Sequence, residues 1–291
     1  MTTNIRLGLA VATIGRPRQL SRLIHSAAAS KHPPDVVAVA NQSGRPLDLD
    51  LGNLPFEVRQ TVSSGGVSRG RNAALDLIGN EVDVVGTPND DTWYEPDTLT
   101  AVRDLFCTDP APDAVAISLM DGDKPRLMLP DDGTLLDRRN VWRAIEPGLF
   151  VRSATMQDLR GFREDIGTGG PSPWQSGEGT DLLLRLLAGG GRIVGASSIR
   201  ALSDGERRDL NRSEWVLKHR RYARGTGYVY GIHGYPLSRS LAIVVAPWVR
   251  AVTARGPLGE RLLVAHARSL GRLEGLLRRP LGTGRRAASH G

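Results

Sequence analysis

Short apolar runs alternate with amphipathic segments along the N-terminal part of the chain. Residues 5–12, 36–40 and 82–85 are rich in small and β-branched apolar side chains and end at turn-forming residues, which predicts buried strands. Between the first two runs, apolar residues recur at helical spacing: Leu20, Leu23, Ile24 and Ala27. Strand, helix and strand in this order predict an α/β fold with a mostly parallel sheet.

The same alternation continues as far as residue 202. Further strands are expected at 56–62, 115–119 and 193–202. Further helices are expected to begin near Ser68, near Pro96 and at Glu178, because apolar residues then recur at helical spacing. The expected element order therefore keeps the parallel-sheet architecture throughout this part of the chain.

Acidic residues follow the strand expected at 82–85. Asn89, Asp90 and Asp91 come shortly after this run, at what would be the carboxyl end of the strand. Open α/β sheets bind ligands at this edge, and carboxylate oxygens suit Mg²⁺ or Mn²⁺ that bridge to phosphates. The alternative is a simple polar turn, since Asn and Asp favour turns.

A glycine-rich segment precedes the second expected helix. Residues 63–72 contain three glycines and two arginines, and such a segment lets the backbone approach a ligand. Arg71 and the helix N-terminus are candidates for contact with a phosphate. The alternative is a capped loop with solvated arginines.

Charge is unevenly distributed along the 291 residues. Residues 206–291 hold 17 Lys and Arg against 5 Asp and Glu, a net charge of +12, whereas residues 1–205 hold 21 against 26, a net charge of −5. A basic extension of this kind indicates an anionic partner surface. The absence of a recognised nucleic-acid motif and the scarcity of aromatic residues there argue against nucleic acid.

Two segments of the basic extension are amphipathic. Residues 241–249 are apolar and include Trp248, and residues 262–277 mix leucines with arginines. Both segments suit an anionic membrane surface, with Arg268, Arg272 and Arg278 as the lipid-facing charges. The alternative is that their apolar faces pack on the domain formed by residues 1–205 or on a second subunit in a homodimer.

Cellular context can be read only from general features. The sequence shows no signal-peptide pattern and no run long enough for a membrane span, and its one cysteine, Cys107, excludes an internal disulfide. We therefore expect a cytoplasmic protein, peripheral to the inner face of the cell membrane.

Four segments in order resemble family 2 glycosyltransferases. They are VATIGRPRQLSRLI, ANQSG, GVSRGRN and NDDTWYEPDTL, and the last is similar to the "DxD" segment of that family. The resemblance implies a GT-A fold, a Rossmann-like domain that binds a nucleotide-diphosphate sugar. It also implies sites for the donor at Thr13, Arg16, Asn41, Ser43, Arg71, Asn89 and Asp90, and for Mg²⁺ or Mn²⁺ at Asp91 and, where the family often has a histidine, Asp204.

A further segment, from Trp174 to Leu182, is similar to the helix start at which the family carries G-E-D and its catalytic base. Glu178 matches the retained acid, whereas Gly179 replaces the other half of the pair. The resemblance implies Glu178 as the base, with Asp181 as the alternative on the same helical face. Acids in a first helical turn also complement the helix dipole, which is the structural alternative. Asn41 and Asn89 are further departures, because each stands where the family usually has an acid.

The resemblance implies an inverting glycosyltransferase that acts on a glycan or a lipid-linked acceptor. We expect a catalytic domain over residues 1–205 and a basic helical extension over residues 206–291, with disorder from about residue 282. One alternative is a catalytically inactive nucleotide-sugar-binding protein. A second is a sugar-1-phosphate nucleotidyltransferase, although that class carries a G-x-G-T-R-L loop where this chain has TIGRP.

Overall fold

The computed structural model describes residues 5–49, 51–108, 111–204 and 210–281. The chain divides into two compact units. The first comprises residues up to 164 together with 178–207, and the second comprises 165–177 together with 208–291. The disorder expected from residue 282 concerns residues outside the described part of the chain.

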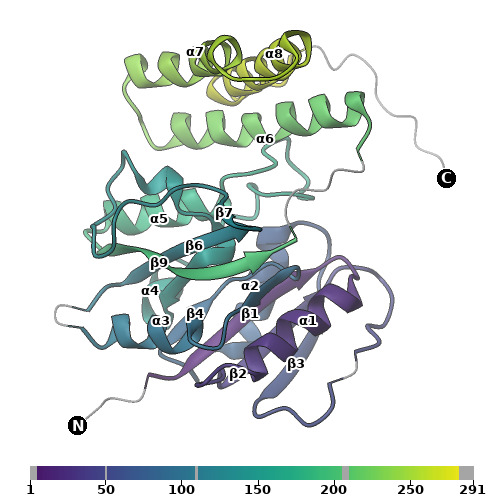
Figure 1. The fold of residues 1–291 in the computed structure, drawn as a ribbon, viewed down its shortest axis with the longest axis vertical. Helices are drawn as coiled ribbons and strands as arrows, with labels where there is room; N and C mark the ends of the chain where they lie inside the picture. The colour runs from purple at the N-terminus through teal and green to yellow at the C-terminus, as the bar shows by residue number, and fades with distance from the viewer. Residues whose placement is uncertain (1–4, 50, 109–110, 205–209, 282–291) are drawn as a thin grey trace. The chain divides into compact units, whose positions relative to one another are not determined.

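The first unit is built on a mixed sheet (Figure 1). Along the sheet the strands follow the order β3-β2-β1-β4-β8-β6-β9-β5, and β7 pairs with β6. The half from β3 to β4 is parallel, whereas β8 runs antiparallel to both of its neighbours. The described strands are β1 (Leu7–Thr13), β2 (Val36–Asn41), β3 (Glu57–Val62), β4 (Val84–Gly86), β5 (Thr92–Tyr94), β6 (Ala114–Asp121), β7 (Lys124–Pro125), β8 (Leu149–Arg152) and β9 (Ile193–Ser203).

Helices flank this sheet, which confirms the α/β fold class. The described helices of the first unit are α1 (Pro17–Ala28), α2 (Val67–Ile78), α3 (Thr98–Phe106), α4 (Ser153–Asp158) and α5 (Glu178–Ala188), with short 3₁₀ turns η1 (Val141–Arg143) and η2 (Glu146–Gly148). The helix α1 begins with Pro17 in its first turn, where a missing N–H costs no hydrogen bond.

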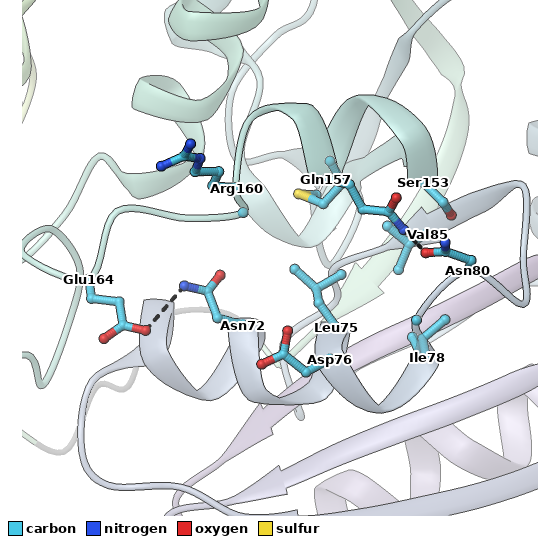
Figure 2. A pocket seen from close by; sticks show the side chains of 13 residues that line it. Asn72, Leu75, Asp76, Ile78, Asn80, Val85, Ser153, Gln157, Arg160 and Glu164 are labelled. Carbon is cyan, nitrogen blue, oxygen red and sulfur yellow. Dashed lines mark hydrogen bonds between the residues drawn. The ribbon is translucent and has the colours of Figure 1, made fainter.

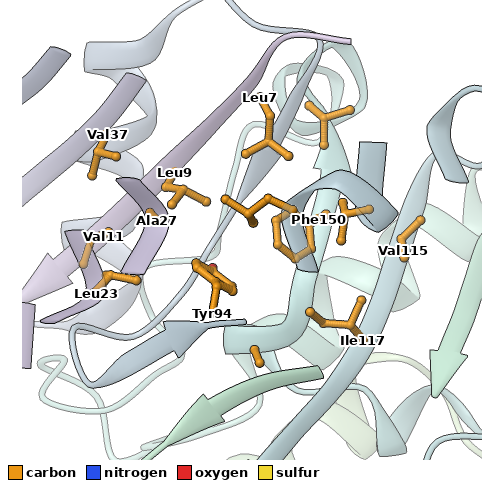
Figure 3. Close-up of a cluster of buried hydrophobic side chains, with 14 of the residues drawn as sticks. Leu7, Leu9, Val11, Leu23, Ala27, Val37, Tyr94, Val115, Ile117 and Phe150 are labelled. Atoms are coloured by element: carbon orange, nitrogen blue, oxygen red, sulfur yellow. The ribbon is translucent and has the colours of Figure 1, made fainter. Parts of the chain in front are cut away.

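The residue sizes along β1 explain how helices cover both faces of the sheet. Leu7, Leu9 and Val11 point into the main apolar core, where Leu9 lies near Ala27 of α1 and Val11 near Leu23 (Figure 3). Successive side chains of a strand face opposite sides of the sheet. The positions between these three therefore face the other side, and they carry small residues. On that side α2 lies so close to the sheet that a methyl group on Gly70 would come within 2.7 Å of the Ala12 Cβ.

The described part of the second unit contains three helices with close backbone contacts. They are α6 (Arg212–Ile232), α7 (Leu237–Thr253) and α8 (Leu258–Leu276), and α8 packs against both α6 and α7. A methyl group on Gly227, Gly271 or Gly275 would collide with the facing helix backbone. The fully buried Glu274 pairs with Arg220 and Arg224 at the same interface. Burial alone would raise the pKa of Glu274, but hydrogen bonds from the two guanidinium groups lower it overall.

Residues 165–177 pack with α6. The ring of Trp174 stacks on that of Tyr228, with centroids 4.6 Å apart and an angle of 5° between the ring planes. The Ser176 hydroxyl donates to the Tyr222 carbonyl at 2.6 Å. The second unit thus includes a loop that precedes α5 in the chain, whereas the sequence placed this loop in the catalytic part.

The arginines of α8 differ from the membrane-facing arrangement expected from the sequence. Arg272 is half-buried and donates to the Ile243 carbonyl of α7, and Arg268 contacts His219 of α6. Burial lowers the pKa of Arg272 to about 10. These two side chains serve packing inside the helical unit, and only Arg278 of the three expected charges is exposed. Among the described helices, none is long and apolar enough to cross a membrane.

Candidate active site

The acidic loop after β4 lies at the carboxyl end of β1. Asn89 forms an isolated parallel bridge with Ala12, so the loop continues the pairing of β4 with β1. Asp90 is 1% exposed, and its Oδ2 accepts hydrogen bonds from the Thr13 hydroxyl at 2.6 Å and from the Arg16 Nε at 3.0 Å. The segment after β1 and the acidic loop after β4 are therefore in direct contact, through side chains that are more than 70 residues apart in the chain.

Arg16 joins both carboxylates of the loop. Its Nη2 donates to Asp90 Oδ1, and its Nη1 lies 3.2 Å from Asp91 Oδ2. Burial alone would lower the pKa of Arg16, but the two carboxylates raise it overall. Burial raises the pKa of Asp90, although Thr13 and Arg16 oppose the rise. With Arg16 positive and both acids ionised, the group carries one net negative charge.

Asp91 has the oxygen that a metal ion would need. Its Oδ1 is buried and has no hydrogen-bond partner among the described residues, whereas both oxygens of Asp90 are engaged. An unpaired buried carboxylate oxygen is costly unless a ligand satisfies it. Mg²⁺ is typically held by one or two carboxylates together with substrate phosphates, so Asp91 fits this role and Asp90 can support it.

Asp204, the other expected metal ligand, is engaged elsewhere. Its Oδ2 pairs with Arg22 Nη2 of α1 at 2.6 Å, and the Arg22 guanidinium lies over the Trp93 ring. The described residues contain no group of three or more His, Cys, Asp or Glu side chains that could hold a metal. A metal at Asp91 would thus take most of its ligands from the donor and from water.

Arg71 connects this loop to α5. It is fully buried, donates from Nη2 to Asn89 Oδ1 at 2.9 Å, and donates from Nη1 to Glu178 Oε1 at 3.1 Å. The sequence suggested that Arg71 meets a phosphate, but in the structure its guanidinium bridges two protein groups. Asn89 keeps the acceptor oxygen that Arg71 requires, which gives this departure from the family pattern a structural role.

Glu178 is a buried carboxylate with altered acidity. It is 6% exposed, and its burial, together with the nearby charge of Glu146, raises its pKa to about 7 although Arg71 opposes the rise. A carboxylate with a pKa near neutrality is a stronger base than an ordinary glutamate and is still ionised in part at neutral pH. This combination suits a general base.

Asp181 lies in a different environment. It is fully buried, and its Oδ2 accepts from Arg185 Nε at 2.9 Å. Arg185 also donates to the carbonyl groups of Leu159 and Gly161. Asp181 thus orients a side chain that ties α5 to the segment after α4, so the structure assigns it a structural contact.

Asn41 and Ser43 form a compact turn after β2. The Asn41 Oδ1 accepts from the Ser43 backbone N–H at 2.9 Å and from its hydroxyl at 2.7 Å. The Asn41 Nδ2 donates to the Arg45 carbonyl at 2.7 Å. These bonds define the shape of the loop at the carboxyl end of β2, where the resemblance places base and ribose contacts.

A separate cavity of about 540 Å³ lies between α2 and α4 (Figure 2). Asn72 and Glu164 face each other at one end of it, with Asn72 Nδ2 3.3 Å from Glu164 Oε1. None of the residues expected to bind donor or metal lines it. The candidate active site is therefore defined by the strand-end clusters and not by this cavity.

Solved structures resemble this chain over most of its length. A fragment of S. aureus TarS in complex with UDP-GlcNAc matches with a TM-score of 0.57 and 16% identity, over 94% of this chain and 93% of that one. The mannosyltransferase PcManGT from Pyrobaculum calidifontis, in complex with GDP-Man and Mn²⁺, matches with a TM-score of 0.64 and 12% identity, over 95% and 88%. The chain has the GT-A fold. It spans 55% of the longer TarS chain, which it matches with a TM-score of 0.55 and 15% identity over 93% of its own length.

No family model and no curated protein matches the sequence of this GT-A chain. Among the residues of the candidate site, sequence reasoning missed Glu146. It belongs to η2, and its charge acts on Glu178 from a position 32 residues earlier in the chain. The sequence around it gives no chemical signal, since a Glu before Pro147 and Gly148 is also typical of an ordinary turn.

Proposed function

We propose that this chain is an inverting glycosyltransferase that moves a sugar from a nucleotide-diphosphate sugar to a hydroxyl group. The observation that carries the proposal is the linkage of two kinds of carboxylate. Asp91 has an unpaired buried oxygen, and Glu178 has a pKa near neutrality; the Asn89–Arg71 contact joins their two segments. The donor complexes of TarS and PcManGT support the choice of donor class.

The proposed reaction is a single displacement. The acceptor hydroxyl oxygen bonds to the anomeric carbon, the bond from that carbon to the diphosphate oxygen breaks, and the hydroxyl proton passes to Glu178. The nucleoside diphosphate leaves with the electron pair of the broken bond. Glu178 must act on the face opposite the leaving group, as the base does in inverting glycoside hydrolases.

Arg16 and Asp91 are proposed to act on the diphosphate side. Arg16 supplies a positive charge next to both acids, and Asp91 would hold Mg²⁺ or Mn²⁺ through its Oδ1. When bound, the metal would stabilise the negative charge that develops on the departing diphosphate. Thr13 orients Asp90, which in turn fixes Arg16.

The proposal is tested with the full chain and a set of UDP-, dTDP- and GDP-sugars in the presence of Mn²⁺. We expect one nucleotide class to bind measurably in calorimetry, and its sugar to be released slowly to water or rapidly to a suitable acceptor. A chain that binds none of these donors would contradict the proposal. Chromatography of the products identifies the nucleoside diphosphate.

Two other functions give different outcomes in the same assay. A catalytically inactive binding protein would bind the donor without forming nucleoside diphosphate. A sugar-1-phosphate nucleotidyltransferase would likewise form no nucleoside diphosphate from the donor, and would instead release pyrophosphate when it is given a sugar 1-phosphate and a nucleoside triphosphate. Glu178 favours turnover, because a buried acid whose pKa is raised to about 7 and which lies in hydrogen-bond contact with Arg71 is typical of a catalytic base.

A membrane-bound acceptor, a glycan or a lipid-linked sugar, is the part of the proposal that concerns the second unit. One face of α7 exposes six large apolar side chains along its whole length, and the helix also carries two arginines, Arg239 and Arg250, outside that face. An exposed apolar stripe with basic neighbours complements an anionic bilayer. The apolar residues are Leu237, Leu241, Val245, Trp248, Val249 and Val252.

We expect the full chain to bind anionic liposomes, and salt to weaken that binding because it screens the arginines. Val245→Glu combined with Val252→Glu should reduce binding at least tenfold, since each places a charge in the apolar face. Val62→Glu is the matched control: Val62 is 79% exposed in the first unit, so the same substitution should leave binding unchanged. The measurement is co-sedimentation with phosphatidylglycerol vesicles.

Equal binding to neutral and anionic vesicles, or binding to neither, contradicts the membrane proposal. Concentration-dependent association in sedimentation velocity that Val245→Glu abolishes would instead assign the α7 face to a second copy of the chain. Nucleic acid is not an expected partner.

A further inference from the structure

Gly179 is the second residue of α5, and the side chain of Glu146 occupies the space next to its Cα. A Cβ on Gly179 would lie 2.8 Å from the Cδ and from the Oε1 of Glu146. The same Oε1 accepts a hydrogen bond from the Gly179 backbone N–H at 2.9 Å. The Glu146 carboxylate therefore occupies the volume that a side chain at position 179 would need, and it can do so only because that residue is glycine.

The turn that carries Glu146 is fixed on both sides. The Thr87 hydroxyl donates to the Glu146 carbonyl at 2.9 Å, which ties η2 to the end of β4. The Gly148 N–H donates to the Ile145 carbonyl at 3.0 Å, and a methyl group on Gly148 would collide with the Ile117 carbonyl of β6. A carboxylate on so constrained a turn has a defined position relative to α5.

Glu146 also differs from Glu178 in its surroundings. Glu178 is buried and bound to Arg71, whereas Glu146 is half-exposed and bound to a backbone amide. The charged groups that act on Glu178 are Arg71 from α2 and Glu146 from η2, and they oppose each other. Glu146 and Glu178 thus place two acids, from two separate elements, at the first turn of α5.

We propose that Glu146 is the second carboxylate of the base site, seated in the space that Gly179 leaves open, and that it acts as a positioning residue for Glu178. Its hydrogen bond to Gly179 fixes the first turn of α5, and its charge keeps Glu178 a stronger base. This inference rests on the proposed function, in which Glu178 accepts the acceptor proton.

The first test is Glu146→Gln, which keeps an acceptor for the Gly179 N–H and removes the charge. We expect kcat to fall roughly tenfold with unchanged donor affinity, and the acid limb of the pH profile to move to lower pH. Gly179→Ala should have a similar effect, because the added methyl group displaces the flexible end of Glu146 without removing it.

A rescue experiment separates this role from general packing. Glu146→Gly should lower kcat, and adding Gly179→Asp should recover roughly tenfold of the loss, because a carboxylate then returns to the same volume from the helix side. An unchanged pH profile in Glu146→Gln, or a double variant no faster than Glu146→Gly, overturns the inference. Circular dichroism of each variant confirms folding.

Direct titration separates failure of this inference from failure of the proposed function. The apparent pKa of Glu178, followed by NMR of ¹³C-labelled glutamate, should fall in Glu146→Gln whether or not a donor is turned over. If wild type binds no nucleotide-sugar but the titration shifts, the proposed function fails and the pairing stands. If wild type turns over a donor and the titration of Glu178 does not shift, the pairing fails alone.

Discussion

Glu178→Gln is expected to reduce transfer by roughly 10²–10⁴-fold while donor binding persists. Glutamine has nearly the same shape and still accepts the hydrogen bond from Arg71, so the contact between α2 and α5 survives. What it lacks is a site for the acceptor proton. Single-turnover rates and calorimetric donor affinity, measured on the same preparation, separate the chemical step from binding.

The same assignment predicts the pH dependence of wild type. Burial and Glu146 raise the pKa of Glu178 to about 7, so its ionised fraction decreases as the pH falls through neutrality. Because only the ionised form accepts a proton, transfer should decline below about pH 7, well above the pH at which an ordinary glutamate titrates. A profile that stays flat down to pH 5 would contradict Glu178 as the base.

Asp181→Asn serves as the comparison on the same helix. Asp181 is fully buried and pairs with Arg185, so its change should lower the melting temperature through the lost charge pair. Turnover per folded molecule should be affected much less than in Glu178→Gln. If Asp181→Asn instead shows the large kinetic loss at an unchanged melting temperature, the base assignment is wrong by one helical turn.

Local sequence patterns predicted the parallel half of the sheet because they depend on neighbours in the chain, but they did not predict that β8 runs antiparallel to both of its neighbours. The alternation of large and small residues in β1 predicts a strand covered on both faces, and Pro17 predicts the start of α1. The strand-end position of Asp90 follows from the same pattern. Since parallel strands end at one edge of the sheet, the contact between Thr13 and Asp90 could be expected before any coordinates.

The rest of the site depends on contacts that no local pattern specifies. Glu146 contacts Gly179 from a turn 33 residues earlier in the chain. In the sequence, Gly179 therefore looks like the loss of an acid, whereas in the structure the Glu146 carboxylate fills the space of the missing side chain. Asp204 pairs with Arg22 for the same reason: the partner comes from a distant helix. Charge counts identify acids and bases, but they do not identify which of them neutralise each other.

In the basic extension, the amino-acid composition did not predict which partners the arginines have. Arg268 and Arg272 were expected to meet lipid, yet Arg268 contacts His219 of α6 and Arg272 donates to a backbone carbonyl of α7. Helical periodicity predicted an amphipathic α8, but the residues that α8 buries within its unit are mostly small, among them Ala267, Gly271 and Gly275, whereas Leu263 and Leu273 are exposed. A continuous exposed apolar face belongs to α7, which the sequence showed only as a short run interrupted by Pro247.

Asp91→Asn is expected to reduce transfer by roughly 10²–10³-fold, because it weakens the group that would hold a cation at the departing diphosphate. Asp91 is the residue to change because its Oδ1 has no partner among the described residues. Excess chelator should have the same effect on wild type. Binding of Mn²⁺ in the presence of the nucleoside diphosphate, followed by electron paramagnetic resonance, should be lost in Asp91→Asn, which gives a readout independent of turnover.

Asp90→Asn is the matched control, since its oxygens are already engaged by Thr13 and Arg16. It should lower the melting temperature and the donor affinity by releasing Arg16, yet leave the Mn²⁺ signal detectable. Full activity of wild type in chelator would remove the metal from the mechanism. Arg16, which lies against Asp91 at 3.2 Å, would then be the positive charge nearest the acidic loop, and Arg16→Ala would have to produce the loss that chelation did not.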